Sequence, residues 1–403
     1  MDPRARAWAA SGAMLLTGRP DGPGLGAPAA LVDTVARSGD ILGRHGHGPA
    51  DDWLALLGER AAFGDLTRQG ATSCGGSTRL LPTSDSWIAV SLARPDDVAA
   101  LPAWLCRDVP PDDPWPTVTA QVSVTPAALL DARAAMLDLP FAALGSVLAF
   151  AEPVFGLPVG ARLVGEDTAG GMPILGATVI DLSVLWAGPL CGQLLALAGA
   201  RVIKVESCTR PDGARHGPGK FFDLLNGMKR SVALDLRSTE GQNDLLRLIQ
   251  SADIVIESAR PRGLEQMGIV ATEVLSQVRG PRVWVSITSH GRGTSSRDRV
   301  GFGDVAAVAG GLVASDALGP CFLADAVADP VGGLVGAAAA LEALTQGGRW
   351  LIDVALAPMA ASMAGPLLDV SGARALPPHA RDVVRHAPLM GCHTAAVMSA
   401  LQP

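Results

Sequence analysis

The sequence contains no tyrosine and only 4% aromatic residues, so the side chains on which single-stranded nucleic acids stack are scarce. Positive charge is also in deficit, because the formal net charge is −7, whereas nucleic-acid binding requires a basic face. The six cysteines form no C-x-x-C pair, the pair typical of zinc ribbons and thioredoxin-like redox sites. We therefore expect reduced thiols, no metal ion and no nucleic-acid partner.

Long apolar runs are missing as well. The first residues do not contain the apolar centre of a signal peptide. The alanine-rich run 331–344 is shorter than the roughly 18 apolar residues that a membrane span needs, and it is typical of a buried core helix. We expect a cytoplasmic protein with no membrane segment.

The chain is rich in core-forming residues, since 48% of its 403 residues are hydrophobic, and this length favours two to three domains. Its most informative stretch runs from Val179 to Glu206. An apolar run, a turn at Ala187-Gly188-Pro189, a small-residue helix and a second apolar run follow one another there, as in a parallel strand–helix–strand unit. One Gly-Pro pair replaces the three glycines of the dinucleotide fingerprint. We therefore do not expect NAD bound in the standard way.

The same alternation continues along the second half of the chain. We expect strands over 178–183, 202–206, 231–235, 254–257, 283–288 and 350–354, and helices over 189–198, 221–226, 239–251 and 331–345. Strands that alternate with helices are typical of a parallel sheet with right-handed crossovers. The fold class is therefore α/β, with a Rossmann-like doubly wound parallel sheet and a smaller α+β domain.

The smaller domain precedes the sheet. We expect a hairpin over 79–93, a helix from Pro95, and further helices over 126–137 and 140–151. The Pro/Gly-rich stretch that follows is interpreted as a linker. The predicted division is an N-terminal segment (1–70), the small domain (71–151), the linker (152–175) and the large domain with a C-terminal tail (176–403).

Several motifs together resemble the class III CoA-transferases, the CaiB/BaiF family, which includes formyl-CoA and carnitine CoA-transferases and the α-methylacyl-CoA racemases. The resemblance covers about 175–365, and its motifs are Ala187-Gly188-Pro189, Gly199 to Glu206, Asn226 to Leu236, Ala252 to Glu257 and Ala328 to Leu334. The order of the ends differs from that of the family, because the small domain comes first. The chain therefore looks circularly permuted or like a shortened fused duplicate. The resemblance implies an interlocked homodimer.

The resemblance places the family's nucleophilic aspartate at Asp329. A carboxylate can attack a thioester and split a difficult exchange into easier steps. The backbone at Gly332-Gly333 is a candidate holder of the oxyanion. Two alternatives stay open: Asp329 caps the helix that begins at Pro330, or Asp325 is the reacting carboxylate.

The resemblance also implies residues that bind coenzyme A (CoA). They are Leu185, Ala187, Lys229, Arg230, Ser258, Arg260 and Thr288. Lys229 and Arg230 are either near the phosphates or a solvated pair in a loop, and Thr288 is expected in the pantetheine channel. Trp186 is either a wall of an acyl pocket or a packing residue, and Glu206 is expected to orient the loop that carries Asp212 and Arg215.

The implied function is transfer of CoA between an acyl-CoA donor and a carboxylic acid acceptor through an aspartyl intermediate. CoA and acyl-CoA are substrates, and no cofactor is expected to stay bound. Two alternatives remain. Relatives often carry asparagine and an aromatic residue where this chain has Ser258 and Ala259, and several carry arginine at Gln266 and some at Ser207. These differences favour a catalytically impaired CoA-binding or assembly protein. A 2-methylacyl-CoA racemase is less favoured, because Gly303-Asp304 replaces the racemase motif.

Overall fold

A seven-stranded sheet forms the centre of the molecule. The computed structural model describes residues 1–45, 52–164, 170–277 and 279–401. The sheet has the order β4-β12-β9-β8-β5-β6-β7. Its strands are β4 (Gly160–Leu163), β5 (Thr178–Asp181), β6 (Arg201–Ser207), β7 (Arg230–Leu234), β8 (Ile254–Glu257), β9 (Val283–Thr288) and β12 (Trp350–Ala355).

All neighbouring strands are parallel except β12 and β4, which are antiparallel. Counted along the chain, the six parallel strands have the order 3-2-1-4-5-6 when read from β7. This is the strand order of the doubly wound nucleotide-binding fold, and it confirms the predicted fold class.

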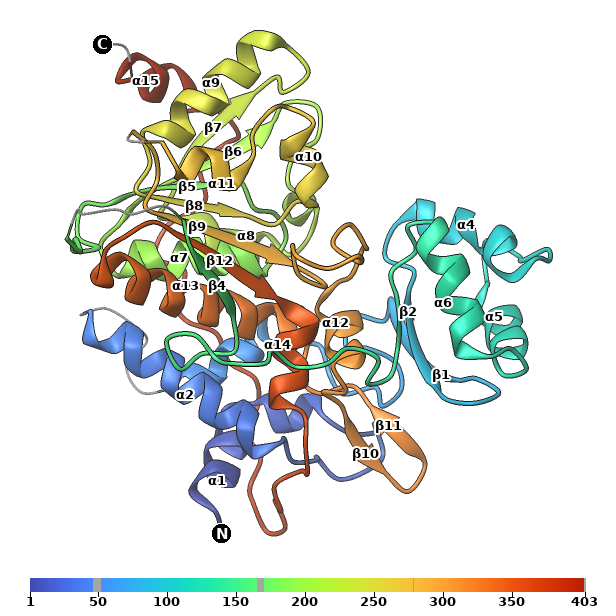
Figure 1. The fold of residues 1–403 in the computed structure, drawn as a ribbon. Helices are drawn as coiled ribbons and strands as arrows, with labels where there is room; N and C mark the ends of the chain where they lie inside the picture. Colours follow the sequence, from blue (N-terminus) through green and yellow to red (C-terminus); the bar gives the residue numbers. More distant parts are fainter. Residues whose placement is uncertain (46–51, 165–169, 278, 402–403) are drawn as a thin grey trace.

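Helices cover both faces of the sheet (Figure 1). On one face lie α7 (Ala187–Leu197), α8 (Gly219–Asn226) and α13 (Ala328–Gln346), and on the other α9 (Thr239–Gln250), α10 (Pro261–Glu265) and α11 (Ala271–Leu275). Successive strand residues point to opposite faces, so Val179 joins the core around α7 and α13, whereas Ile180 joins the core around α9. This two-sided burial explains why the strands read as continuous apolar runs.

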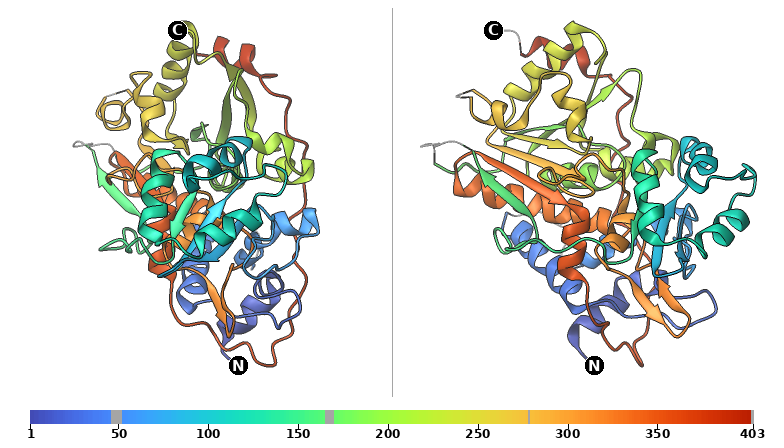
Figure 2. Two further views of the ribbon diagram at one scale, coloured as in Figure 1. Left: turned by 90° about the vertical axis from the view of Figure 1, so that its right-hand side faces the viewer. Right: turned by 45° about the vertical axis from the view of Figure 1, so that its right-hand side comes forward.

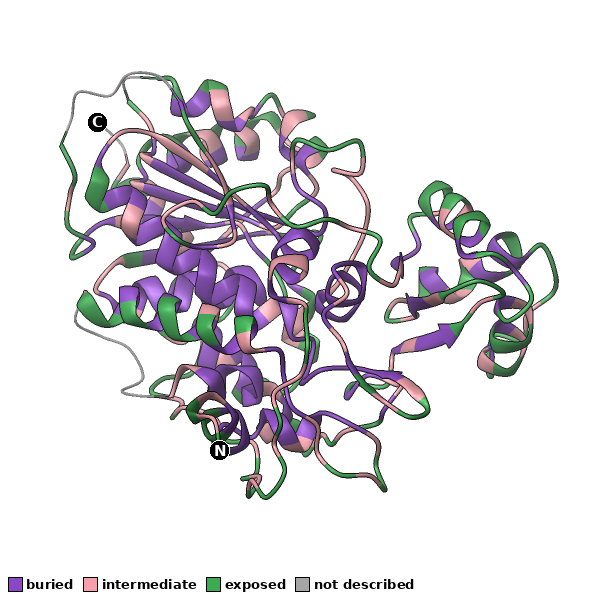
Figure 3. Ribbon diagram, turned by 60° about the horizontal axis from the view of Figure 1, so that its bottom comes forward, coloured by how far each residue is buried: buried purple, intermediate pink, exposed green. Residues whose placement is uncertain are grey.

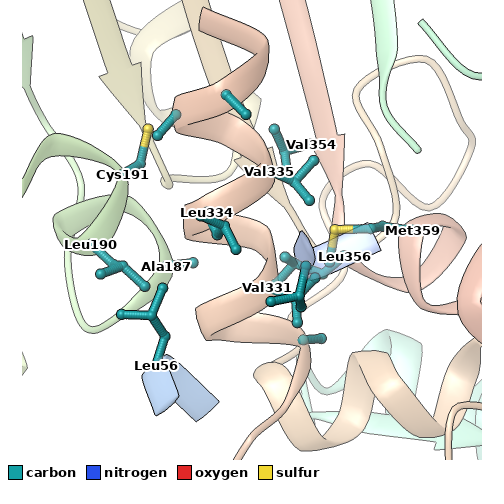
Figure 4. Close-up of a cluster of buried hydrophobic side chains, with 14 of the residues drawn as sticks. Leu56, Ala187, Leu190, Cys191, Val331, Leu334, Val335, Val354, Leu356 and Met359 are labelled. Atoms are coloured by element: carbon teal, nitrogen blue, oxygen red, sulfur yellow. The ribbon is translucent and has the colours of Figure 1, made fainter. Parts of the chain in front are cut away.

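Helix α13 packs against its neighbours through buried side chains such as Leu190, Leu334 and Leu356 (Figure 4), and two glycines allow a close approach. A side chain at Gly333 would lie 2.6 Å from the carbonyl oxygen of Ala187 at the start of α7. A side chain at Gly332 would lie 2.4 Å from Leu356, the first residue of α14 (Leu356–Met363). Both glycines are buried inside the helix. The absence of side chains at these two positions therefore serves helix packing, and the role of their backbone as an oxyanion holder stays a prediction.

The N-terminal segment forms a third layer outside α13 (Figures 1 and 2). Its helix α2 packs against α13, which explains why α13 is buried on all sides and apolar all round. The elements are α1 (Pro3–Ala10), η1 (Ala13–Leu16), α2 (Ala29–Arg44), η2 (Trp53–Leu57) and α3 (Glu59–Gly64). The C-terminal tail crosses the molecule and ends in α15 (Thr394–Ser399), next to β7.

The small domain stands to one side of the sheet and has its own core (Figures 1 and 3). It consists of β1 (Thr78–Pro82), β2 (Trp87–Ser91), α4 (Pro95–Leu105), α5 (Trp115–Val122), α6 (Ala127–Met136) and β3 (Phe141–Ala143). The predicted helix over 140–151 is wrong. Phe141–Ala143 pairs with the open edge of β2, and Phe141 packs edge-on against Trp104 at 6.0 Å, so tertiary pairing overrides helix propensity.

Two further segments connect the domains. The stretch interpreted as a linker contributes β4 to the edge of the large sheet, which the sequence did not indicate. After β9 the chain forms α12 (Gly303–Ala309) and a hairpin of β10 (Ala314–Asp316) and β11 (Gly319–Cys321). Helix α12 packs against β2 and β3 of the small domain and against α13 and α14, so it lies between the two domains.

Candidate functional site

The strand order reverses between β5 and β8, so the loops after these two strands leave the sheet at neighbouring carboxyl ends. Ligands of doubly wound folds bind at this point. The loop after β5 carries Leu185, and the loop after β8 carries Ser258 and Arg260. The two loops touch, because the Ser258 hydroxyl accepts a hydrogen bond from the Val184 amide at 3.0 Å. The structure therefore brings together four predicted CoA-binding residues, these three and Ala187, where a ligand is expected.

The turn at Gly188 has a local explanation. A side chain on Gly188 would lie 2.1 Å from the Cβ atom of Ser183, so this glycine makes room for the preceding loop. Ser183 is fully buried, and its amide donates to Asp181 at 2.9 Å. Leu185 follows with a φ of +69°, a left-handed conformation that is unfavourable for a residue with a γ-branched side chain.

Buried charged side chains hold the backbone of the loop after β5 in place. Lys204 and Asp212 form an ion pair of 2.8 Å with both side chains almost fully buried. Asp212 also accepts the Leu185 amide at 2.9 Å. Glu206 accepts the Asp212 amide at 3.0 Å and pairs with Arg215, which confirms that Glu206 orients the loop carrying these two residues.

Lys229 was expected near the phosphates of CoA or in a solvated pair, but it lies inside the protein. Its ammonium group is buried, 2.7 Å from Asp181 and 2.8 Å from the Pro189 carbonyl oxygen. Burial lowers the pKa of Lys229. Burial alone would raise the pKa of Asp181, but the two lysine charges beside it lower that pKa. The expectation that Lys229 contacts phosphate needs correction, because this lysine is a structural counter-ion. Arg230 is exposed at the start of β7 and stays a candidate.

Arg260 also has a partner within the protein. Its guanidinium lies 2.7 Å from Asp138, which follows α6 of the small domain, and Arg262 lies 3.4 Å from the same carboxylate. Thr288 is buried at the end of β9, where its hydroxyl accepts the Gly291 amide at 2.9 Å. A phosphate that contacts Arg260 would therefore have to share this arginine with Asp138.

Asp329 lies in the first turn of α13, half-buried. It does not cap the helix, because Val327 is the N-cap residue. Its Oδ2 atom accepts the Gly303 amide at 3.2 Å, and a side chain on Gly303 would lie 2.7 Å from this carboxylate. Burial raises the pKa of Asp329 to about 7, an effect that Arg60 opposes. A carboxylate with this pKa reacts or exchanges protons near neutral pH.

Arg60 provides the positive charge of the site. It contacts both oxygens of the fully buried Asp325, through Nε at 2.8 Å and through Nη2. Burial alone would lower the pKa of Arg60, but the surrounding carboxylates raise it, that of Asp325 most strongly. Asp304 in the first turn of α12 is buried, and this burial, together with Asp325, raises its pKa to about 7. Asp325, the alternative nucleophile, is therefore engaged in an ion pair with Arg60.

Trp186 connects the two parts of the site. It is buried at the start of α7, and the Arg60 guanidinium lies over its ring, 5.1 Å from the ring centre. Phe221 packs against the same ring edge-on at 5.1 Å. The indole thus packs between a cation and another aromatic ring, which favours the packing interpretation of this residue.

Two residues of the site were missed from the sequence. Arg60 comes from α3, more than 260 positions before Asp325, and no local motif marks it. Asp304 is an acidic residue in the first turn of a short helix, a common position for structural reasons. Among the described residues, no group of three or more His, Cys, Asp or Glu is arranged to hold a metal ion, and no helix is long and apolar enough to cross a membrane.

Comparisons with known proteins match the large domain. The model of the family "CoA-transferase family III" matches residues 174–396. An acyl-CoA transferase of Fusarium pseudograminearum is 33% identical over 155 residues, which cover 35% of this chain and 34% of the relative. A succinyl-CoA–D-citramalate CoA-transferase of Chloroflexus aurantiacus is 35% identical over 147 residues, which cover 35% and 36%. The matched part therefore spans about a third of the length of these relatives.

Among solved structures, a CaiB/BaiF family protein from Brucella suis is 30% identical, with a TM-score of 0.43 over 47% of this chain and 55% of that chain.

Proposed function

Because the chain belongs to CoA-transferase family III, we propose that it transfers CoA from an acyl-CoA donor to a carboxylic acid acceptor, with Asp329 as the covalent nucleophile. The observation that carries this proposal is the state of Asp329. It lies within the matched region, it is partly accessible, and the Gly303 amide orients one of its oxygens. Its competitor Asp325 is fully buried in an ion pair with Arg60.

The position of Asp329 relative to the loop after β5 also supports the proposal. Gly333, one turn further along α13, touches the backbone of Ala187 at the start of α7. Arg60 extends from Asp325 to Trp186 in the same region. The proposed nucleophile therefore lies on a helix that packs against the start of α7, next to the loop of Leu185 that is proposed to contact CoA.

In the proposed reaction, a carboxylate oxygen of Asp329 bonds to the thioester carbonyl carbon and the C–S bond breaks, which leaves a mixed anhydride and CoA thiolate. The thiolate attacks Cγ of Asp329, which releases the donor acid as a carboxylate and forms an aspartyl-CoA thioester. The acceptor carboxylate then attacks Cγ and displaces the thiolate. Finally, the thiolate attacks the acceptor carbonyl, which yields the new acyl-CoA and frees Asp329. No net proton is consumed.

The test combines turnover with detection of the covalent intermediate. The purified protein is incubated with a panel of acyl-CoA donors and carboxylate acceptors, and its peptides are analysed by mass spectrometry. We expect a CoA adduct on the peptide that contains Asp329, and neither adduct nor transfer in Asp329→Ala. Asp223→Ala is the matched control, because Asp223 pairs with the exposed His386. Transfer by Asp329→Ala at the wild-type rate would refute the proposal.

A second candidate function is CoA binding without turnover. It is favoured by the two cations that are engaged inside the protein, Lys229 with Asp181 and Arg260 with Asp138. Binding of CoA in calorimetry, with no transfer and no adduct for any donor, would support this candidate instead. The racemase alternative is disfavoured, because a glycine amide and not a histidine contacts Asp329.

The interlocked homodimer also remains a proposal. It predicts a dimer that light scattering detects at every dilution, and a stable monomer would contradict it.

A further inference from the structure

The backbone of the loop after β5 is fixed by side chains that do not belong to the loop. The Val184 amide donates to Ser258, the Ser183 carbonyl accepts from Lys204 at 2.8 Å, and the Leu185 amide donates to Asp212. A loop whose successive backbone groups are all bound in this way is preorganised. Leu185 is its most strained residue, because it keeps a left-handed conformation although the residue is 41% exposed.

Packing of the Leu185 side chain does not explain this conformation, since much of that side chain faces solvent. The contact that remains is the hydrogen bond to Asp212. Strain of this kind persists only where the surroundings over-determine it, and it clusters at ligand sites. Asp212 itself cannot move easily, because it is fully buried, pairs with Lys204 and also accepts the Ala214 amide at 3.0 Å.

We infer that Asp212, held by Lys204, is a positioning residue for CoA: it fixes Leu185 in the left-handed conformation that the bound ligand requires. The inference rests on the proposed function and adds residues to it. Lys204 and Lys229 are two of only three lysines in the chain, and both are buried beneath this loop. These ammonium groups therefore act on the ligand through the protein backbone and not by direct contact with phosphate.

Loss of the Asp212 anchor should weaken the binding of CoA and leave the rate of the chemical steps nearly unchanged. If the anchor is removed, Leu185 relaxes towards the extended region, and only a fraction of the molecules keeps the binding-competent loop. The apparent dissociation constant rises by the inverse of that fraction, and a fraction of about one tenth raises it about tenfold. Asp329 lies on another helix, so kcat at saturating substrate should change by less than about threefold.

Two sets of variants test the anchor. Asp212→Leu with Lys204→Met removes the acceptor and both charges together, so no unpaired charge is left buried. Asp212→Asn with Lys204→Met also leaves no buried charge unpaired, but it keeps an oxygen for the Leu185 amide. If Asp212→Leu with Lys204→Met does not fold, Leu185→Pro provides the same test from an exposed position, since proline has no amide hydrogen and cannot adopt a positive φ. Leu185→Ala is its partner variant, because it removes the side chain and keeps the amide.

The matched control is Arg19→Met with Asp316→Leu. This pair removes a two-point ion pair between the N-terminal segment and the β10–β11 hairpin. Three quantities are measured for each variant: the dissociation constant of CoA by calorimetry, KM and kcat for an acyl-CoA donor, and amide hydrogen exchange of the peptide over 182–187 without ligand.

We expect the dissociation constant and KM to rise about tenfold in Asp212→Leu with Lys204→Met and in Leu185→Pro, with faster exchange over 182–187. Asp212→Asn with Lys204→Met and the control should stay within about threefold of wild type. The inference is overturned if Asp212→Leu with Lys204→Met binds CoA as wild type does, if kcat falls while KM is unchanged, or if Asp212→Asn with Lys204→Met binds CoA as weakly as Asp212→Leu with Lys204→Met. These results leave the proposed function intact, whereas a wild-type protein without CoA affinity refutes both.

Discussion

Replacing Asp329 by asparagine should make the protein more stable at alkaline pH while it abolishes transfer. The folded-state pKa of Asp329 is about 7, against 3.8 in the unfolded chain. The folded state therefore binds more protons than the unfolded state between these values, so stability falls as the pH rises from about 4 to about 7. The difference between the two pKa values corresponds to a loss of about 4 kcal/mol in the free energy of unfolding if the carboxylate is fully buried. Because the carboxylate is half-buried, water reduces this energy, and we expect a loss of roughly 1–3 kcal/mol in the free energy of unfolding.

Scanning fluorimetry from pH 5 to pH 9 measures this effect. For a chain of this length, 1–3 kcal/mol corresponds to about 1–4 °C. Asp329→Asn should melt higher than wild type at pH 8, and the difference should shrink to less than half of that value at pH 5. Asp325→Asn is the control with the opposite sign, because it leaves the Arg60 guanidinium without its buried counter-ion. Wild-type kcat/KM should fall about tenfold per pH unit below pH 7. A variant that melts lower than wild type at pH 8 would refute the reasoning.

Three further outcomes are expected. Gly303→Ala should lower kcat at least about tenfold, since its side chain would lie 2.7 Å from the Asp329 carboxylate. Steady-state kinetics measure this effect, and circular dichroism checks that the fold is unchanged. An unchanged kcat would contradict the prediction. Asp138→Asn should release Arg260 and lower the dissociation constant of CoA about threefold or more at low salt; an equal or weaker affinity in calorimetry counts against an Arg260–phosphate contact. CoA well above its dissociation constant should raise the melting temperature by about 2 °C or more, whereas NAD should not; the reverse pattern would exclude the CoA-binding interpretation.

The sheet and its helices were predictable because each element carries its own signal. Strands buried on both faces read as apolar runs, and several of the turns between the elements contain glycine or proline, as at Gly199. The boundaries of β8 and β9 agree with the predicted ranges, and α13 begins three residues earlier than expected. The helix predicted over 140–151 failed, because nothing in the local sequence shows that the edge of β2 is open and pairs with Phe141.

The site was predictable only where it coincides with a motif. Asp329 and the loop around Leu185 belong to contiguous stretches, so a family resemblance could locate them. Arg60 reaches the site from α3, and its meeting with Asp325 exists only in the folded chain. Lys229 shows the converse. A lysine next to an exposed arginine looks solvated in the sequence, but a side chain on Gly192 of α7 would lie 3.2 Å from its ammonium nitrogen, so the missing side chain there makes room for its burial.

The distance between the proposed nucleophile and the CoA loop is set by the packing of α7 against α13. Asp329 begins one of these helices and Ala187 begins the other, and the two touch where Gly333 meets the Ala187 carbonyl oxygen. Protein interiors are close-packed and hardly compressible. A methyl group at Gly333 would therefore push α13 away from α7 and increase the distance between Asp329 and the loop of Leu185. The small residues along α13 are therefore part of the proposed reaction geometry, although none of them is expected to touch the reacting atoms. A reacting pair misplaced by about 1 Å can lose about a hundredfold in rate, which gives this helix contact a direct consequence for turnover.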